Sequence, residues 1–388
     1  MPFDMTLVQR GARLRRSPFF GATQRYGAKA YTVYNHTLFP IRFADEEAEY
    51  WHLVNHVTLW DVSVERQVEI TGPDAFRFVN RLTPRDLTRC AVGQGKYVVI
   101  TADDGGIIND PVLLRLGENH FWLALADSDV LLWARGVALD SGLRVEIHEP
   151  DVSPLQVQGP KAGEVVQELF GDRVLGLKYY HFIETTLDEI PVVVTRTGWT
   201  GEVGYEIYLR DGSRGDELWE RIMAAGRPYD IRPTGPSDIR RIEAGILNWG
   251  ADITLQDNVY EAGLDRLVDE DKAADYIGRE ALARIRWQGV RRKLVGVEIE
   301  GGRLAFNATK WPVRAEEGEL VGRVTSAVWS PRLQRNIGYA MVAAGHTRLG
   351  SELEVEVAGE GVRSARVVPK PFVDPDKAIP KREVVALA

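Results

Sequence analysis

The sequence is poor in cysteine, with Cys90 as the only one among 388 residues. An intrachain disulfide needs two cysteines and a cysteine-based metal cluster needs several, so both are excluded. Hydrophobic residues make up 44% of the chain, yet no apolar stretch approaches the roughly 20 residues that span a bilayer. The first 20 residues also lack the continuous apolar segment of a secretion signal. From these absences we expect a cytoplasmic protein without a membrane segment.

The chain also lacks a long run of basic residues, and its formal net charge is −8. Nucleic acids and anionic membrane surfaces bind basic patches, so we expect neither as a partner. No GxGxxG motif follows a strand-like segment, and no P-loop lysine motif is present. A dinucleotide or nucleoside triphosphate cofactor is therefore not supported.

Strand-like and helix-like segments are mixed through the first part of the chain. "VERQVEITG" (64–72) alternates and predicts a strand with Val64, Val68 and Ile70 on one face. Asp74 is expected to cap the helix that follows. Helical spacing predicts helices over residues 74–82, 127–138, 159–171 and 216–226. This mixture predicts an α+β fold.

After about residue 285 the pattern changes to short strands separated by glycine and polar turns. The segments are "KLVGVEIEG", "GELVGRVTSAVWS", "NIGYAMV" and "SELEVEVAG". Such a pattern predicts a small β-barrel or sandwich. We place the boundary between residues 285 and 286. The prediction is a region 1–285 of two interleaved α+β subdomains, followed by a C-terminal β-barrel domain over 286–388.

The stretch "TADDGGIINDPVLL" (101–114) places Asn109 and Asp110 inside an apolar run that reads as a strand. A carboxylate there is costly to desolvate unless a group pairs with it. Pro111 has no amide donor, so this point is expected to be a strand edge or a bulge. Asp110 either caps a turn, pairs with an arginine, or serves a functional site.

The stretch "VVVTRTGWTGEVGYEIYL" (192–209) ends in an alternating strand with Glu206 and Tyr208 on one face. A carboxylate accepts paired N–H bonds from a flat heterocycle such as a pterin, and Gly204 would let the backbone come close. The alternative is a hairpin whose outer face is merely solvated.

Two further features have structural as well as functional interpretations. His52 and His56 have metal-ligand spacing on a helix, but no third ligand is evident, and we assign no metal site. Trp199 and Trp249 either fill the core or face a ligand, because an aromatic ring face attracts sulfonium and quaternary ammonium groups.

Taken together, nine segments in order along nearly the whole chain resemble the folate-dependent aminomethyltransferase family, typified by the T protein of the glycine cleavage system. They are "LWDVS", "ITGPDA", "DDGGIINDPV", "LQVQGPKA", "RTGWTGEVGYEI", "RIEAGILNWGAD", "NVYEAGLD", "GRVTSAVWSPRLQRNIGYA" and "PFVDP". The resemblance implies three domains in a ring, with tetrahydrofolate in the central channel.

The same resemblance implies roles for individual residues. Glu206 matches the glutamate that grips the pterin, and Tyr208 and Trp199 match aromatic positions of the folate site. Asp110 matches the acidic residue next to the reacting folate nitrogen, and is expected to be catalytic. Tyr97 matches a tyrosine near the methyl donor.

Departures from the T protein indicate a branch within the family. The T protein usually has His-Met-Gly after "DVS" and Ala-Arg-Asp before its "RLEAG" element. This chain has "DVSVERQVEI" and Pro236, Ser237 and Asp238 at those places. These changes are similar to the tetrahydrofolate-dependent demethylases of the dimethylsulfoniopropionate demethylase type. We therefore expect an enzyme that moves a methyl group from a small donor to N5 of tetrahydrofolate.

The expected donor is dimethylsulfoniopropionate or a similar compound, with Tyr97, Trp249, Tyr34 and His36 as the residues that bind it. Ala124 stands where a small hydroxyl residue is expected in a sulfonium demethylase, so the donor stays open. The alternatives are O-demethylation of aromatic methyl ethers, for which Tyr34, His36 or Tyr97 would supply an acid, and N-demethylation of methylated amines. Neither the donor nor the oligomeric state follows from the sequence.

Two readings from other classes remain. One is a non-catalytic folate-binding protein of the kind that serves iron–sulfur cluster assembly, which carries a cysteine in the stretch "RTGWTGE"; this chain has none there. The other is a folate-binding module that works beside a separate flavin-dependent amine oxidase subunit.

Overall fold

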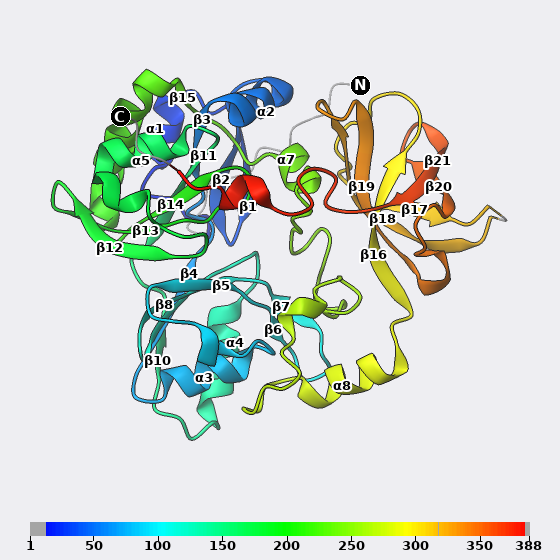
Figure 1. Cartoon of the computed structure of the whole chain (residues 1–388), viewed down its shortest axis with the longest axis horizontal. Coiled ribbons are helices and arrows are strands. Elements are labelled where there is room, and N and C mark those ends of the chain that lie inside the picture. Colours follow the sequence, from blue (N-terminus) through cyan, green and yellow to red (C-terminus); the bar gives the residue numbers. More distant parts are fainter. Residues whose placement is uncertain (1–12, 317, 385–388) are drawn as a thin grey trace.

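Three lobes form a ring in the computed structural model, which describes residues 13–316 and 318–384 (Figure 1). Two lobes combine sheets with helices, and the third is a closed barrel of six strands. The predicted three-domain α+β ring with a C-terminal barrel is thereby confirmed.

The first lobe contains a six-stranded sheet in the order β12-β13-β14-β11-β3-β15. Its strands are β12 (Phe182–Leu187), β13 (Ile190–Thr195), β14 (Gly204–Leu209), β11 (Ser153–Gln158), β3 (Val57–Asp61) and β15 (Ile231–Pro233). Neighbouring strands are antiparallel except for β3 and β15, which are parallel. The helices of this lobe are α1 (Phe20–Arg25), α2 (Glu46–Asn55), α5 (Ala162–Phe170) and α6 (Gly215–Gly226).

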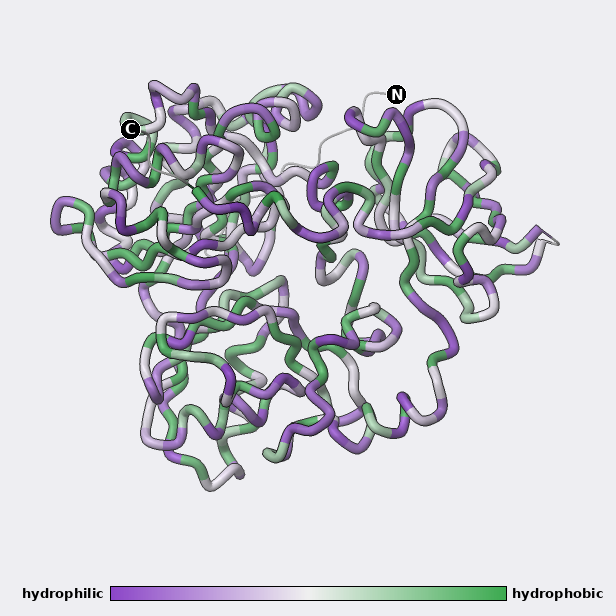
Figure 2. Tube along the Cα trace, in the orientation of Figure 1, coloured by the Kyte–Doolittle hydropathy of each residue, from purple (hydrophilic) through white to green (hydrophobic). Residues whose placement is uncertain are grey.

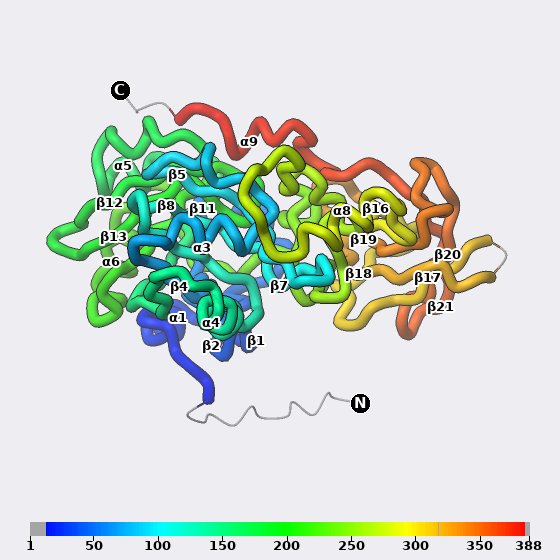
Figure 3. Tube along the Cα trace, turned by 90° about the horizontal axis from the view of Figure 1, so that it is seen from below, coloured from blue at the N-terminus to red at the C-terminus, as the bar shows by residue number. Residues whose placement is uncertain are grey.

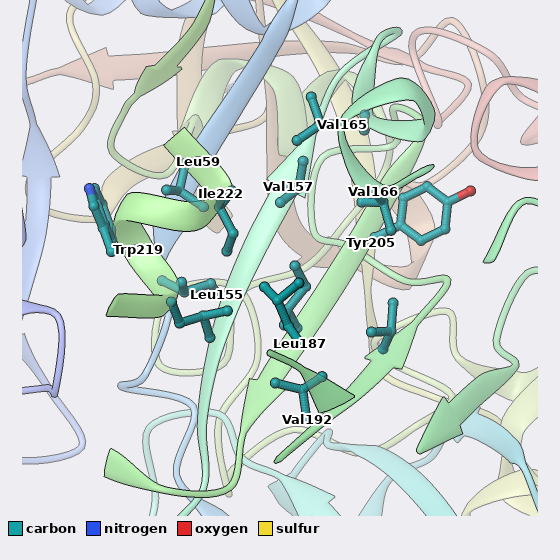
Figure 4. Close-up of a cluster of buried hydrophobic side chains, with 14 of the residues drawn as sticks. Leu59, Leu155, Val157, Val165, Val166, Leu187, Val192, Tyr205, Trp219 and Ile222 are labelled. Atoms are coloured by element: carbon teal, nitrogen blue, oxygen red, sulfur yellow. The ribbon is translucent and has the colours of Figure 1, made fainter. Parts of the chain in front are cut away.

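Every residue of β14 and all but Ser153 of β11 are buried, and one face of these strands carries the core of the lobe. Figure 4 shows this core, in which Leu155 and Val157 of β11 and Tyr205 of β14 lie against Val165 of α5 and Ile222 of α6. The opposite face of the same two strands carries Gln156, Glu206 and Tyr208. Because successive side chains of a strand point to opposite faces, packing the core fixes the direction of this polar set.

The second lobe is inserted between β3 and β11 in the sequence. Its antiparallel sheet has the order β10-β4-β9-β8-β5. The strands are β10 (Glu146–His148), β4 (Gln67–Thr71), β9 (His120–Ala124), β8 (Val112–Gly117) and β5 (Gln94–Tyr97), with a small ribbon of β6 (Ile100–Thr101) and β7 (Ile107–Asn109) beside it. Helices α3 (Ala75–Leu82) and α4 (Val130–Leu139) complete the lobe.

A small apolar cluster joins these two sheets. Trp122 and Ala124 of β9 and Leu114 of β8 pack with Val193 of β13 and Tyr208 of β14. The polar face of the first sheet is therefore turned toward the second lobe. A separate hairpin of β1 (Ala30–Tyr34) and β2 (Thr37–Arg42) precedes both sheets in the chain.

The third lobe is a closed antiparallel barrel with the order β16-β19-β18-β17-β20-β21. The strands are β16 (Arg292–Ile299), β17 (Trp311–Arg314), β18 (Leu320–Ser330), β19 (Arg335–Ala343), β20 (Glu352–Val357) and β21 (Gly361–Val368). Inward valines and isoleucines alternate with outward polar residues and fill the interior. Helices α7 (Asp238–Glu243) and α8 (Arg279–Gln288) lie between the first two lobes and the barrel in the sequence, and the predicted boundary at 285/286 falls within α8.

Two local predictions differ from the structure. The strand predicted over 64–72 begins only at Gln67, because the Glu65 amide donates to the carbonyl of Val62 and closes a turn. Asp74 precedes α3 but makes no side-chain cap. Its carboxylate instead accepts hydrogen bonds from the backbone amide and Nε of Arg144, at 3.0 and 3.3 Å.

Hydrophobic and hydrophilic residues are interspersed in all three lobes (Figure 2). Among the described residues, none of the helices is both long and apolar enough to cross a bilayer. The chain after the barrel runs back to the first lobe along one face of the ring and contains α9 (Ala378–Lys381) (Figure 3).

A buried ion pair fastens α7 to the barrel. Arg241 donates from Nη1 to Asp252 Oδ2 at 2.7 Å, and neither side chain is exposed. Arg241 Nη2 also donates to Ser326 Oγ of β18 at 2.9 Å. The hydroxyls of Thr325 and Ser326 donate to Asp252 Oδ1, at 2.8 and 2.6 Å. The network saturates both charges, as a buried pair requires.

We predict that Arg241→Met lowers the free energy of unfolding by about 3–5 kcal/mol, because it leaves the Asp252 carboxylate buried without its cation. Urea denaturation followed by fluorescence measures the change. The control is Arg366→Met, whose partner Glu352 and own side chain are each 57% exposed; that pair is worth about 0–1 kcal/mol. Equal effects of the two substitutions would contradict the prediction.

Candidate functional site

Glu206 is the most completely hydrogen-bonded carboxylate on the polar face of the first sheet. It lies on β14 between two strands, opposite Gln156 of β11 and Thr195 of β13. Gln156 Nε2 donates to Oε1 at 2.8 Å, and the hydroxyls of Thr197 and Tyr208 donate to Oε2 at 2.8 and 2.7 Å. Only 4% of Glu206 is exposed. Burial raises the pKa of Glu206, and these hydrogen bonds oppose the rise.

The side chain of Gln156 has a hydrogen-bond acceptor that no protein group uses. Its Oε1 is buried and has no hydrogen-bond partner, although Nε2 is used by Glu206. A buried acceptor without a partner costs about 1–3 kcal/mol. An acceptor next to a carboxylate suits a ligand that presents two neighbouring N–H donors.

Asp110 comes from the second lobe, at the break between β7 and β8 that Pro111 predicts. Tyr97 OH, at the end of β5, donates to Asp110 Oδ2 at 2.8 Å. Burial raises the pKa of Asp110 to about 7, against the opposing effect of the Tyr97 hydrogen bond. Among the described residues, Asp110 neither caps a turn nor pairs with an arginine; its side-chain partner is Tyr97. Asn109, in contrast, has a structural role. Its Nδ2 donates to the carbonyl of Ala126 at 3.0 Å, and its Oδ1 accepts a hydrogen bond from the amide of Ala126 at 3.1 Å.

Glu65 lies near the carboxylates that the two lobes contribute, Glu206 and Asp110. Burial, followed by the charges of Glu206 and then Asp110, raises the pKa of Glu65 well above its usual range. Both carboxylates therefore lie within electrostatic reach of Glu65. No side-chain hydrogen bond or ion pair to Glu65 occurs in the described part of the chain. The sequence prediction missed this residue because the alternation in "VERQVEITG" placed it with Gln67 and Glu69 on the strand face opposite the apolar residues.

Two tyrosines lie within electrostatic reach of these carboxylates. Tyr34, at the end of β1, has a pKa raised by burial and then by the charges of Asp110 and Glu65. Tyr180, which the sequence prediction also missed, has a pKa raised by burial and then by Tyr179 and Glu206. Asn35 holds the hairpin in place, because its Nδ2 donates to the carbonyls of Val64 and Ala126 at 2.9 and 3.0 Å.

The two predicted tryptophans lie at the margin of this group. Trp249 donates from Nε1 to the carbonyl of Ile107 in β7 at 3.0 Å, and packs with the cluster that Tyr97 also contacts. Trp199 packs beside Trp60, and the Arg241 guanidinium lies 5.5 Å from its ring centroid. His36 is exposed at the tip of the β1–β2 hairpin, and the structure does not bring it to the other predicted residues.

The expected use of Gly204 for close approach of a ligand is wrong. A Cβ at Gly204 would lie 2.3 Å from Gln158 Oε1, and one at Gly198 would lie 2.1 Å from the same atom. Gln158 fills this space and accepts a hydrogen bond from the Thr200 hydroxyl at 2.8 Å. These glycines therefore make room for a protein side chain.

His52 of α2 and His56, the C-cap residue of that helix, stack with ring centroids 4.8 Å apart. Asp230 supplies the third donor that the sequence lacked, with all three candidate ligand atoms within 4.8 Å. Arg232 holds both Asp230 carboxylate oxygens, at 3.2 and 3.0 Å, and His52 Nε2 lies 2.7 Å from the Asp230 carbonyl. These contacts satisfy the Asp230 carboxylate and Nε2 of His52, whereas Nδ1 of His56 is buried without a hydrogen-bond partner.

The geometry can be compared with known proteins. The family model "GCVT N-terminal domain" matches residues 19–272, and "Glycine cleavage T-protein C-terminal barrel domain" matches residues 292–374. Dimethylsulfoniopropionate demethylase DmdA of Ruegeria pomeroyi is 40% identical over 92% of this chain and 96% of that protein. An aminomethyltransferase of Shouchella clausii is 34% identical over 93% of this chain and 98% of that protein.

A solved structure shares the fold. The aminomethyltransferase T of the glycine cleavage system from Bartonella henselae superposes with a TM-score of 0.85 at 24% identity, covering 93% of this chain and 99% of that one.

The site predicts a pH-dependent stability difference between the wild type and Asp110→Asn. A carboxyl whose folded pKa is raised from 3.8 to about 7 stabilises the fold below pH 4, and that contribution is lost as the pH rises to 7. The wild type should therefore lose stability relative to Asp110→Asn between pH 4 and 7, by on the order of 1 kcal/mol per pH unit. Urea denaturation at several pH values measures this; exposed Asp103→Asn is the control. A pH-independent difference would contradict the assignment.

Proposed function

This chain belongs to the glycine cleavage T-protein family, and from that premise we propose that it transfers a methyl group from a cationic donor to N5 of tetrahydrofolate. The observation that carries the proposal is that Glu65 lies within electrostatic reach of both Glu206 of the first lobe and Asp110 of the second, with Tyr34 within reach of Glu65 and Asp110. The Ruegeria relative is named a dimethylsulfoniopropionate demethylase, and dimethylsulfoniopropionate is the donor that we propose here.

Glu206 and Gln156 fit the pterin end of tetrahydrofolate. A reduced pterin presents a ring N–H beside an amino group, and Glu206 with the unpartnered Oε1 of Gln156 offers two neighbouring acceptors. Tyr208 and Thr197 orient the Glu206 carboxylate through their hydroxyls. These residues would hold the pterin without further rearrangement of β14.

Tetrahydrofolate supplies the nucleophilic N5 that accepts the methyl group. In the transfer the S–CH3 bond of the sulfonium breaks, an N–CH3 bond forms, and a neutral thioether leaves. The protein's task is therefore to align the donor and to handle the charge and proton at the acceptor nitrogen. Asp110, with a pKa of about 7, can stabilise positive charge there and accept a proton at neutral pH.

Glu65 and the tyrosines suit a cationic donor. An unpaired carboxylate beside Asp110 and Glu206 is destabilised by like charges, and a bound cation relieves that repulsion. Tyr34 and Tyr97 add aromatic surface, which attracts sulfonium and quaternary ammonium groups. A neutral methyl ether would gain nothing from Glu65, so the site favours a sulfonium or ammonium donor over an aromatic ether.

Trp249 and Trp199 belong to this proposal as supporting walls. Trp249 is held against β7 next to Asp110 by its bond to Ile107. Trp199 lies beside Trp60, which is opposite Gln156 in the sheet. His36 is exposed and is not part of the proposed donor site.

We predict that Asp110→Asn lowers turnover by at least about tenfold with tetrahydrofolate saturating, because one electrostatic contact to the acceptor nitrogen is lost. Formation of 5-methyl-tetrahydrofolate from dimethylsulfoniopropionate is the readout. Asp103→Asn, in the exposed turn before β7, should leave turnover unchanged. Near-normal turnover of the Asp110 variant would remove this residue from the mechanism.

A second prediction concerns Glu65→Gln and the charge of the donor. With the carboxylate gone, kcat/KM for dimethylsulfoniopropionate should fall by about tenfold, the loss of one desolvated cation contact. Residual rates with a methoxybenzoate should not fall. Initial rates with dimethylsulfoniopropionate, glycine betaine and a methoxybenzoate measure this, with exposed Glu118→Gln as the control. An equal loss for every donor would show that Glu65 does not select for charge.

A further inference from the structure

Two histidines and an aspartate come together at one edge of the six-stranded sheet. His52 lies in the last turn of α2, His56 is the C-cap residue of that helix, and Asp230 directly precedes β15. Because Ile231 of β15 pairs in parallel with Val57 of β3, the residues just before them, Asp230 and His56, lie at the starts of two neighbouring strands. The sheet thus joins segments far apart in the sequence (Figure 1).

The hydrogen bond of His52 leaves one of its ring nitrogens free to bind a metal ion. Only 7% of His52 is exposed, and its Nε2 lies 2.7 Å from the backbone carbonyl of Asp230. A carbonyl oxygen can only accept, so Nε2 carries the proton and Nδ1 carries the lone pair. Nδ1 in turn lies 4.0 Å from Oδ2 of Asp230. A histidine that ligates a metal typically donates its other ring N–H in this way, to a backbone carbonyl or a carboxylate.

His56 contributes a ring nitrogen that no protein group uses. Its Nδ1 is buried and has no hydrogen-bond partner in the described part of the chain. Its ring is nearly parallel to that of His52, at an interplanar angle of 14°. One ligand atom from each histidine and one from Asp230 all lie within 4.8 Å of one another. The buried nitrogen has lost water without gaining a protein partner, and a bound cation would supply that partner.

Small side-chain movements would close this set around one ion. Bonds of about 2.0–2.2 Å place the ligand atoms of a tetrahedral zinc site about 3.3 Å apart. The side chain of Asp230 is 49% exposed and His56 is half-buried, so both can move toward an ion. Arg232 donates to both carboxylate oxygens of Asp230, at 3.2 and 3.0 Å. A carboxylate has about four lone-pair sites, so Arg232 orients Asp230 and still leaves positions for a metal.

We propose that His52, His56 and Asp230 bind a divalent transition-metal ion, and that Zn²⁺ suits the site best. Two imidazoles and one carboxylate are a ligand set that zinc uses, and water would fill the remaining position. Mg²⁺ and Ca²⁺ prefer sites made of oxygen atoms, so neither should bind here. The sequence predicted no metal site because the third ligand is far from the two histidines along the chain.

The proposed ion has a role in stability. It would tie the end of α2 and the start of β3 to the start of β15, an edge strand of only three residues. An ion that binds the folded chain in preference to the unfolded chain raises the melting temperature. This inference is independent of the methyl transfer proposed above, so either can fail without the other.

Calorimetric titration of the chelator-treated full-length protein with ZnCl2 tests the site. The wild type should bind one equivalent of Zn²⁺ at micromolar concentrations, and MgCl2 should give no binding. His56→Gln and Asp230→Asn should each weaken Zn²⁺ binding by at least about tenfold, because each removes a ligand. Asparagine tolerates the positive φ of 57° at position 230, so the second variant keeps the turn.

His148→Gln is the matched control, because His148 is also a histidine beside a carboxylate, with Nε2 2.8 Å from Oε2 of Glu69. It should bind Zn²⁺ as the wild type does. With EDTA present, all four proteins should melt at similar temperatures, and Zn²⁺ should raise the melting temperature of the wild type and His148→Gln only.

Three results would overturn the site. One is the absence of Zn²⁺ binding by the wild type. Another is Zn²⁺ affinity, or a rise in melting temperature, that is the same in the wild type, His56→Gln and Asp230→Asn. The third is a loss of affinity confined to His148→Gln, which would assign the ion to the neighbourhood of Glu69.

Discussion

The repulsion that Glu206 and Asp110 exert on the buried Glu65 is the constraint on which the candidate site depends. Three carboxylates in a poorly solvated space cannot all ionise without compensation. The fold supplies part of this compensation through hydroxyl and amide donors, four of them to Glu206 and one to Asp110. Bound ligands would supply the rest of the compensation. A site of this kind favours N–H donors and cations, which is what a pterin and a sulfonium compound bring.

The order of the chain explains why such a site can form. The second lobe is inserted between β3 and β11, so the polar face of the first sheet meets it along the cluster of Trp122, Val193 and Tyr208. Glu206 arrives from one lobe and Asp110 from the other, while Glu65 sits in the turn that leads from the first lobe into the second. The Arg241–Asp252 pair, through the bond of Arg241 to Ser326, then holds α7 against the barrel.

Much of this could be predicted from the sequence, and the limits have physical causes. The alternation of "GYEIYL" sorted Glu206 and Tyr208 from Tyr205 and Ile207 correctly, because that strand is regular and its Tyr205 and Ile207 pack in the core of the first lobe. Glu65 was missed because a turn interrupts the alternation just before β4. The role of Gly204 was misread because Gln158, which occupies the space, lies on the neighbouring strand β11, far from Gly204 in the sequence. Contacts between segments far apart in sequence leave no local pattern.

The most direct measurement is a crystal structure of the protein with bound tetrahydrofolate. The account predicts one folate between the first two lobes, with the amino edge of its pterin on Glu206 and Gln156 and its N5 next to Asp110. A folate bound elsewhere, or one that contacts Glu206 while Asp110 faces away from N5, would contradict it.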